Sequence, residues 1–279
     1  MENTLAFNVL VDNTDGETLK GEWGLSIFIE YGDKKILLDA GLSGLFADNA
    51  DGMGIDLSET DYAVLSHAHD DHANGFDRFF ECNDHAPLYV ARDCDENCYD
   101  RKGLFYKYAG IPKGIMQRHI GRIIRADNDM YIDSGIRLLG HTTPGLDRQG
   151  SMEKMYLRQG AFRFIPDDFR HEQSLIFELP DGIVIFNSCS HAGADVIINE
   201  AMQSYPGQRI LAMIGGFHLF DKNDEYVRNF AHRVEATGVE KIYTGHCSGN
   251  KALSILMEEL GDKVHAIKTG LVFRINSCK

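Results

Sequence analysis

The sequence lacks several features that would place the protein in a membrane, outside the cell or on nucleic acid. No apolar run approaches the ~20 residues of a membrane-spanning helix, and MENTLAFNVLVDN at the start lacks the basic and apolar segments of a secretory signal. Six cysteines in 279 residues show no disulfide-scaffold spacing. Basic residues number 28 against 42 acidic ones, and the net charge of −14 disfavours binding to nucleic acid or anionic membranes. We therefore expect a cytoplasmic protein with reduced thiols and a small-molecule substrate.

The apolar pattern that is present predicts a layered α/β protein. Gly- and Asp-bounded runs over 5–13, 25–32 and 34–41 predict strands, and 61–72 is expected to be a buried strand that ends in a histidine cluster. In the last third of the chain, strands alternate with helices, which is typical of layered α/β architecture. The expected strands there are a hairpin over 174–193 and single strands over 209–218, 239–247 and 265–275. The expected helices cover 194–205, 225–238 and 250–261.

Residues 93–169 have a less regular pattern, and we expect them to form a cap or lid within a single domain over 1–279. Basic residues here either meet a phosphate or form a solvated basic face: Lys102, Lys107, Lys113, Arg118, Arg122 and Arg125. The aromatic residues of GLFYKYAG, 103–110, offer a surface for stacking on a flat ring. Cys94 and Cys98 offer a small metal or redox pair, or are simply buried thiols.

Histidine and aspartate are crowded into VLSHAHDDHANG, residues 64–75. A strand places alternate side chains on one face, so His67 and His69 are expected to point together. The loop that follows turns Asp71 and His72 toward a neighbouring position. Imidazole and carboxylate together suit zinc, manganese or iron. Because four candidate ligands in six residues exceed what one tetrahedral site takes from one segment, the motif predicts two adjacent metal ions.

Three later apolar strands also end in a histidine beside glycine, at His191, His218 and His246. Since sites in α/β folds gather at strand ends, we expect these side chains to converge on one centre. His191 and His246 are predicted as ligands, and His218 as a proton-transfer group in preference to a ligand. Cys189 is either a ligand or a buried thiol. Asp39 ends KKILLDAG and is either a turn residue or a carboxylate that fixes the tautomer of a ligand histidine.

The segment SHAHDDHANG, preceded by ILLDAG and followed by strand-end histidines, resembles the metallo-β-lactamase-fold superfamily. NSCSHAG, IGGFHL and YTGHCSG look like the subgroup named for the methanopterin-pathway dihydropterin ribofuranosylaminobenzene phosphate synthase. The resemblance implies a four-layer αββα sandwich with a metal site at one edge. It implies that His67, His69 and His191 bind a first metal ion. It likewise implies that Asp71, His72 and His246 bind a second.

The sequence departs from the superfamily pattern at three positions. His141 in GHTTPG precedes the proline and is out of place for a ligand. Cys189 stands where a bridging aspartate is expected, so the group that bridges the metal ions is left open. Trp23 stands where the subgroup often has a histidine, which is expected to reshape the pocket.

The resemblance implies a metal-dependent hydrolase with two divalent metal ions, zinc first, with manganese or iron as alternatives. A metal-activated water would attack a small ester, such as a phosphoester or a pterin or sugar-phosphate type of substrate. Asp71 would hold metal and orient the nucleophile, and His218 would protonate the leaving group. The alternatives are a di-iron redox protein on the same fold and a metal-binding protein without catalysis. A nuclease is disfavoured by the net charge of −14.

Overall fold

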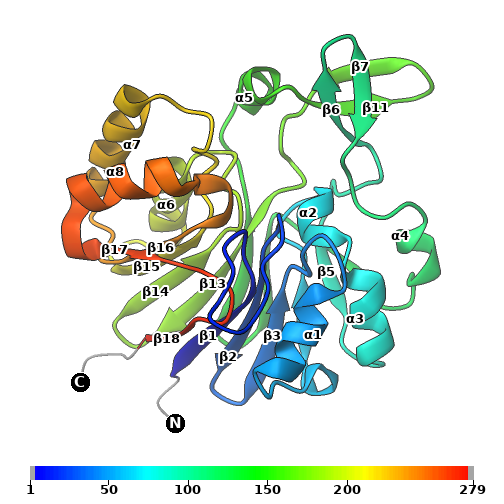
Figure 1. Ribbon diagram of the computed structural model, residues 1–279, viewed down its shortest axis with the longest axis horizontal. Helices are drawn as coiled ribbons and strands as arrows, with labels where there is room; N and C mark the ends of the chain where they lie inside the picture. Colours follow the sequence, from blue (N-terminus) through cyan, green and yellow to red (C-terminus); the bar gives the residue numbers. More distant parts are fainter. Residues whose placement is uncertain (1–3, 276–279) are drawn as a thin grey trace.

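Two seven-stranded sheets pack face to face between two layers of helices, as Figure 1 shows for the computed structural model. The model describes residues 4–275, so Cys278 lies outside the described chain. The largest apolar cluster contains side chains of both sheets, and two further clusters lie under the outer helices. The expected four-layer αββα sandwich is therefore confirmed. None of the helices within 4–275 is long and apolar enough to span a bilayer.

The first sheet has the order β18-β1-β2-β3-β4-β5-β8. Its strands are β1 (Leu5–Val11), β2 (Ser26–Tyr31), β3 (Lys34–Leu38), β4 (Tyr62–Val64), β5 (Leu88–Ala91), β8 (Ile123–Ala126) and β18 (Val272–Ile275). The helices of this half are α1 (Leu45–Gly52), α2 (Asp70–Ala73), α3 (Phe76–Cys82) and α4 (Ile115–Arg118), with a short 3₁₀ helix η1 (Leu57–Glu59). Alternation fixes which face is which: Ile27 and Ile29 point into the core between the sheets, whereas Phe28 points toward the helices.

The second sheet has the order β17-β16-β15-β14-β13-β10-β9. Its strands are β9 (Asp129–Asp133), β10 (Ile136–Gly140), β13 (Gln173–Leu179), β14 (Gly182–Phe186), β15 (Ile210–Gly215), β16 (Ile242–Thr244) and β17 (Val264–Ala266). The helices of this half are α6 (Ala194–Ser204), α7 (Asp224–Ala236) and α8 (Asn250–Leu260), with the 3₁₀ helices η2 (His246–Ser248) and η3 (Gly261–Lys263). The three helices expected from the sequence are therefore confirmed, with slightly shorter bounds.

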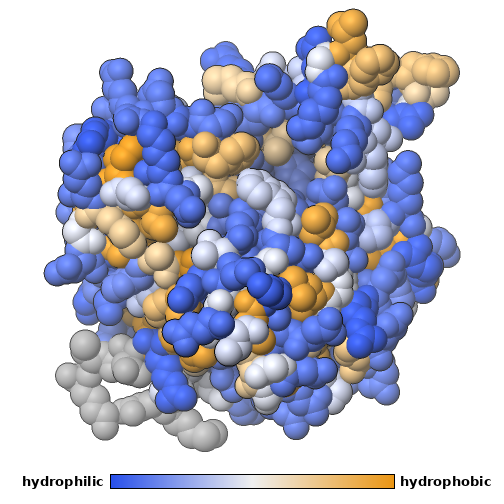
Figure 2. All heavy atoms as spheres, in the orientation of Figure 1, coloured by the Kyte–Doolittle hydropathy of each residue, from blue (hydrophilic) through white to orange (hydrophobic). Residues whose placement is uncertain are grey.

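A third, four-stranded sheet projects above the sandwich (Figure 1), and we call it the cap sheet. It contains β6 (Cys98–Lys102), β7 (Phe105–Tyr108), β11 (Met155–Gln159) and β12 (Arg163–Pro166), and α5 (Leu146–Glu153) leads into β11. The interval 93–169 is thus not one unbroken cap, because β8, β9 and β10 inside it pair with the two main sheets. The tips of the cap sheet are apolar and exposed at Leu104, Phe105 and Phe162, where Figure 2 shows an orange crest.

The expected strand over 265–275 is wrong, because the structure divides it between the two sheets. β17 pairs in parallel with β16, whereas β18 pairs antiparallel with β1. Gly270 lies between them with a positive φ of 83°, a conformation that glycine adopts without strain. The chain therefore crosses from one sheet to the other at this point. Helices α1 and α3 were not anticipated from the sequence.

Candidate metal centre

The candidate ligands converge because parallel strands end at one edge of each sheet. His191, His218 and His246 follow β14, β15 and β16, which are parallel neighbours. Asp39 and the histidine motif follow β3 and β4, which are also parallel neighbours. Because the two sheets face each other, these strand ends meet. We call His67, His69 and His191 the first group, and Asp71, His72 and His246 the second group.

In the second group, the outer ring nitrogen of each histidine is held by a polar side chain, which is buried for Asp39 and partly buried for Asn13. His72 Nδ1 donates to Asp39 Oδ2 over 2.7 Å, and His246 Nδ1 donates to Asn13 Oδ1 over 2.9 Å. Both protons are then on Nδ1, so both Nε2 atoms carry lone pairs. These two Nε2 atoms lie only 3.1 Å apart, with Asp71 Oδ2 3.7 Å from one and 3.5 Å from the other. Facing lone pairs repel each other, so the pair needs a positive group between its two nitrogens: either a proton on His72, whose pKa is raised, or a metal ion.

The first group is built in the same way. His67 Nδ1 donates to Ser66 Oγ over 2.8 Å, and Ser66 Oγ donates in turn to Asp39 Oδ2 over 2.7 Å. His191 Nδ1 donates to Glu153 Oε2 over 2.8 Å. The Nε2 atoms of His67 and His191 are buried and have no hydrogen-bond partner within the described chain. An unpartnered imidazole nitrogen is costly in the interior, and a metal ion satisfies it.

Cys189 lies between the two groups. Its Sγ lies within 4.8 Å of the ligand nitrogens of His67 and His191, and within 4.8 Å of those of His72 and His246. It is 3.3 Å from His72 Nε2. Burial, followed by the neighbouring Cys247, raises the pKa of the Cys189 thiol well above its usual value. A nearby cation reverses this effect and makes the thiolate available as a ligand.

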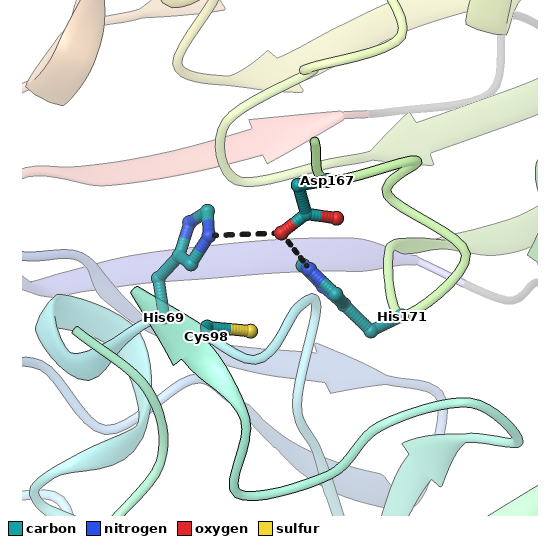
Figure 3. A group of neighbouring side chains, drawn as sticks. All are labelled: His69, Cys98, Asp167 and His171. Carbon is teal, nitrogen blue, oxygen red and sulfur yellow. Dashed lines mark hydrogen bonds and ion pairs between the residues drawn. The ribbon is translucent and has the colours of Figure 1, made fainter. Parts of the chain in front are cut away.

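His69 is held less tightly than the other histidines (Figure 3). Its Nε2 lies 4.0 Å from Asp167 Oδ2, and its ring packs edge-on against those of His67 and His191. Asp167 also accepts a hydrogen bond from His171 Nε2 over 3.0 Å. His69, Asp167 and His171 form, with the sulfur of Cys98, a compact buried group of metal-ligand types.

Burial keeps most of the clustered imidazoles neutral. It lowers the pKa of His69 and of His246 to about 3, and it lowers the pKa values of His67 and His191 well below the usual range. Neutral imidazole is the form that binds metal. His72 is the exception, because Asp71 and Asp39 outweigh burial and raise its pKa to about 9. A cation next to His72 would favour the neutral ligand form instead.

His218 reaches the centre from the other side of His191. Its Nε2 lies 3.6 Å from Glu153 Oε2, and its Nδ1 is buried without a hydrogen-bond partner in the described chain. Burial opposes the charged form, but the hydrogen bond with Cys247 and the charge of Glu153 raise the pKa of His218 to about 9. His218 therefore carries a proton at neutral pH, as a general acid must.

A cavity of about 330 Å³ opens onto the centre. Its polar and aromatic lining includes Trp23, Asp70, Asp100, Lys102 and Phe220. Trp23 is 49% exposed, and its ring packs edge-on against Phe220 and tilted against His246. Lys102 is the one basic residue of this lining, and its Nζ already pairs with Asp100 over 3.1 Å.

The structure does not bring the other basic residues of the interval 93–169 to this cavity. Arg118 pairs with Asp77, and Arg122 and Arg125 donate to backbone carbonyls. Lys107 and Lys113 are not part of the lining either, and Lys113 lies over the ring of Tyr108. The aromatic residues of 103–110 serve the cap sheet, where the ring of Tyr106 stacks on that of Phe164.

The comparisons with known proteins agree with this geometry. The model of the metallo-beta-lactamase superfamily matches residues 24–151. The solved structure of a metal-dependent hydrolase of the beta-lactamase superfamily superposes with a TM-score of 0.82 at 24% identity, over 98% of this chain and 100% of that one. The chain has the metallo-β-lactamase fold. The resemblance stated from the sequence is confirmed.

Two further similar proteins have names that refer to different activities. The chain is 26% identical over 267 residues to the 7,8-dihydropterin-6-methyl-4-(beta-D-ribofuranosyl)-aminobenzene-5'-phosphate synthase of Methanocaldococcus jannaschii, over 90% of this chain and 89% of the relative. The solved structure of a diphosphatase from the PhnP family has a TM-score of 0.55 at 13% identity, over 98% of this chain and 99% of that one. Of these two similar proteins, one is named as a synthase and the other as a diphosphatase.

Within this metallo-β-lactamase fold, His141 has a different partner set from the ligand histidines. Its two ring nitrogens each lie 3.0 Å from a carboxylate oxygen, one of Glu172 and one of Glu200. Glu172 also accepts hydrogen bonds from the backbone N–H groups of His191 and Ala192. His141 thus steadies the loop that carries His191 and does not face the metal centre.

Sequence reasoning missed the residues that support the centre from distant parts of the chain. Glu153, Asp167 and Asn13 had no local signal, because their partners are brought to them by the fold alone. Cys247 did have a signal, since it directly follows His246. Its Sγ lies 3.3 Å from Cys189 Sγ and accepts from the backbone N–H of His218.

Proposed function

We propose that this protein is a metal-dependent hydrolase with a dinuclear metal centre. The observation that carries the proposal is that the two groups flank Cys189. His67 Nε2 and His191 Nε2 have no hydrogen-bond partner within the described chain, and His72 Nε2 and His246 Nε2 face each other over 3.1 Å. His67, His69 and His191 would hold one ion, and Asp71, His72 and His246 the other, with Cys189 between them in place of an aspartate. Nitrogen, oxygen and sulfur donors in this mixture suit zinc best, with iron or manganese as alternatives.

When bound, two such ions would lower the pKa of a shared water toward about 7 and polarise the oxygen of the substrate. The protein's own residues supply the rest of the chemistry. Asp71, with its carboxylate at the edge of the cavity, would orient the nucleophile. His218 would give its proton to the leaving group. Trp23 and Phe220 would form the apolar wall against which the remainder of the substrate lies.

The substrate that fits best is a small ester, with phosphoesters first. The cavity of about 330 Å³ has room for a small molecule only. The named activities of the relative and of the diphosphatase favour a phosphate-containing substrate, including the pterin or sugar-phosphate type. Because Lys102 is already paired with Asp100, the metal ions themselves would make the main contact with the phosphate.

A substrate panel on metal-analysed protein tests this proposal. Phosphoesters, lactones and thioesters are incubated with the protein loaded with zinc, manganese or iron, and with protein stripped by a chelator. Hydrolysis that requires metal and prefers phosphoesters is the expected result. Metal-loaded protein that hydrolyses none of them would overturn the proposal. Iron with electron transfer to an added flavoprotein would support the redox alternative, and metal without any turnover would support a binding protein.

A further inference from the structure

The hairpin formed by β11 and β12 touches the first group at three points. We call four residues at its foot the hairpin base: Glu153 and Lys154 before β11, and Asp167 and Phe169 after β12. Glu153 binds His191 Nδ1 over 2.8 Å, and the ring of Phe169 stacks on that of His191 with centroids 4.4 Å apart. Asp167 faces His69 Nε2 over 4.0 Å. All three side chains are buried, with Glu153 1% exposed and Asp167 and Phe169 fully enclosed.

The hairpin base is a fixed unit. The backbone N–H of Asp167 donates to the carbonyl of Met155 over 3.0 Å and closes the foot of the hairpin. A Cβ on Gly150 of α5 would lie 2.1 Å from the carbonyl oxygen of Asp167, so α5 packs directly on this foot. Lys154 and Phe169 both have positive φ angles, of 61° and 50°. Residues other than glycine adopt this conformation only where the surroundings enforce it.

The second group has no such contact with the hairpin. Its histidines are held by Asp39 and Asn13, which belong to the first sheet's strand ends. Among the described residues, the hairpin base therefore binds His191 of the first group and faces His69 across 4.0 Å, and it contacts neither histidine of the second group. His67 is the first-group histidine held by the core, through Ser66 and Asp39.

The four-residue group in Figure 3 is itself a candidate metal site, but His171 argues against it. The backbone N–H of Ala68 donates to His171 Nδ1 over 3.2 Å, so that nitrogen is an acceptor. The imidazole proton is then on Nε2 and is donated to Asp167. A metal on Nε2 would force the proton onto Nδ1, against the N–H of Ala68. His171 thus serves to hold Asp167 in place beside His69.

We propose that Glu153 and Asp167 are positioning residues for the first metal ion, and that through them the cap sheet controls that ion separately from the second. A carboxylate that binds the outer nitrogen of a ligand histidine fixes its tautomer and raises its affinity for metal. A substrate bound against the cap sheet would then change the protein's affinity for the first metal ion through the hairpin base. This inference rests on the dinuclear centre proposed above.

The test measures metal binding, not activity. Zinc-loaded Glu153→Ala and Asp167→Ala variants are titrated with a competing chelator, and release of each ion is followed. We expect one of the two ions to be held roughly 10–100-fold more weakly than in the unaltered protein. The other ion should keep its affinity. Cadmium NMR, with one signal for each occupied site, should show one signal shifted or broadened and one unchanged.

The chain offers matched controls for both positions. Asp147 lies on the same helix as Glu153, and Asp168 adjoins Asp167 but pairs with Arg170. Asp147→Ala and Asp168→Ala should therefore leave both affinities unchanged. Glu153→Gln keeps an oxygen that accepts from His191 Nδ1, so it should restore most of the affinity that Glu153→Ala loses. Glu153→Gln and, at the second position, Asp167→Asn also guard against misfolding of the alanine variants, and circular dichroism of the metal-free proteins checks the fold.

Several outcomes would overturn the inference and are distinguishable from failure of the proposed function. If both ions bind more weakly to the same extent, or if the affinity for neither ion changes, separate control of the first ion is rejected. A third ion in the unaltered protein that Cys98→Ser removes and Cys94→Ser retains would make Asp167 a ligand. If the unaltered protein binds no metal at all, the dinuclear centre itself is wrong.

Discussion

His72 and His191 lie in opposite halves of the candidate metal centre, and their outer ring nitrogens bind to different parts of the fold. Asp39, at the end of a core strand, accepts from His72, whereas Glu153, at the foot of a projecting hairpin, accepts from His191. The carboxylate that orients a ligand histidine thus belongs to the sandwich for His72 and to the hairpin beside the substrate cavity for His191. The difference suggests a centre with one permanent ion and one whose affinity depends on the cap sheet.

The largest effect should come from removing an inner ligand of the core-held half. His72→Ala deletes the imidazole that faces His246 and Cys189, so we expect loss of at least the second metal ion and of all metal-dependent turnover. Elemental analysis after gel filtration measures the metal content. His85→Ala, at an exposed position, is the control. Full metal content in the His72→Ala variant would show that the second group does not bind metal.

Asp39→Asn should weaken the binding of both ions, whereas changes in the hairpin base should weaken the binding of one ion only. Asp39 accepts from His72 directly and from Ser66, which accepts from His67, so one carboxylate supports a histidine in each half. The amide of Asn would turn an N–H donor toward one of these partners. Chelator titration should show both ions released earlier. Asp61→Asn, whose carboxylate accepts from Lys35 N–H at the far end of β3, should change neither ion. If only one ion binds more weakly in the Asp39→Asn variant, Asp39 supports only one of the two groups, despite its hydrogen-bond links to both.

The inner ligands were predictable from the sequence because the motif itself brings them together. The expected strand over 61–72 is wrong, because β4 ends at Val64 and the chain turns through a loop into the single turn of α2. The four ligands within 64–75 nevertheless stay close together, because the motif is short. His191 and His246 were predictable because parallel strands end at a common edge. Those assignments as metal ligands stay predictions until metal is measured.

Asp39 was anticipated as a carboxylate that fixes a histidine tautomer, and it does bind His72. The rest of the outer support could not be predicted, because it depends on contacts between distant segments. Glu153 is 38 residues from His191 and lies in a helix with no unusual sequence feature. The alternation over 265–275 is the same for one strand as for two, so the crossing between sheets was also hidden. The basic residues of the interval 93–169 suggested a phosphate site, but the guanidinium group of Arg118 binds the Asp77 carboxylate and those of Arg122 and Arg125 bind backbone carbonyls. Composition cannot distinguish these two uses of arginine.

His218→Ala separates a proton donor from a ligand. His218 belongs to neither group, and the raised pKa of about 9 keeps its ring protonated at neutral pH. We expect both ions to be retained and turnover to fall by roughly 10²–10⁴-fold. The loss should be smallest for substrates with good leaving groups, because they need little protonation. A fall in metal content as large as that of His72→Ala would make His218 a ligand. Unchanged turnover on every substrate would leave it a structural histidine.

The smallest effect should come from Cys189→Asp, which places the superfamily's usual bridging residue between the two halves. An aspartate carboxylate reaches both groups with oxygen ligands, as the Cys189 sulfur does now, so both ions should remain bound. Cobalt-loaded protein provides the measurement: the thiolate charge-transfer absorption should disappear in Cys189→Asp while the metal content stays the same. Cys189→Ala, which leaves a gap between the halves, should lose metal, and Cys94→Ser should keep both the absorption and the metal. Should Cys189→Ala retain both ions at unchanged affinity, the sulfur is a buried thiol and the two halves are joined by something other than this residue.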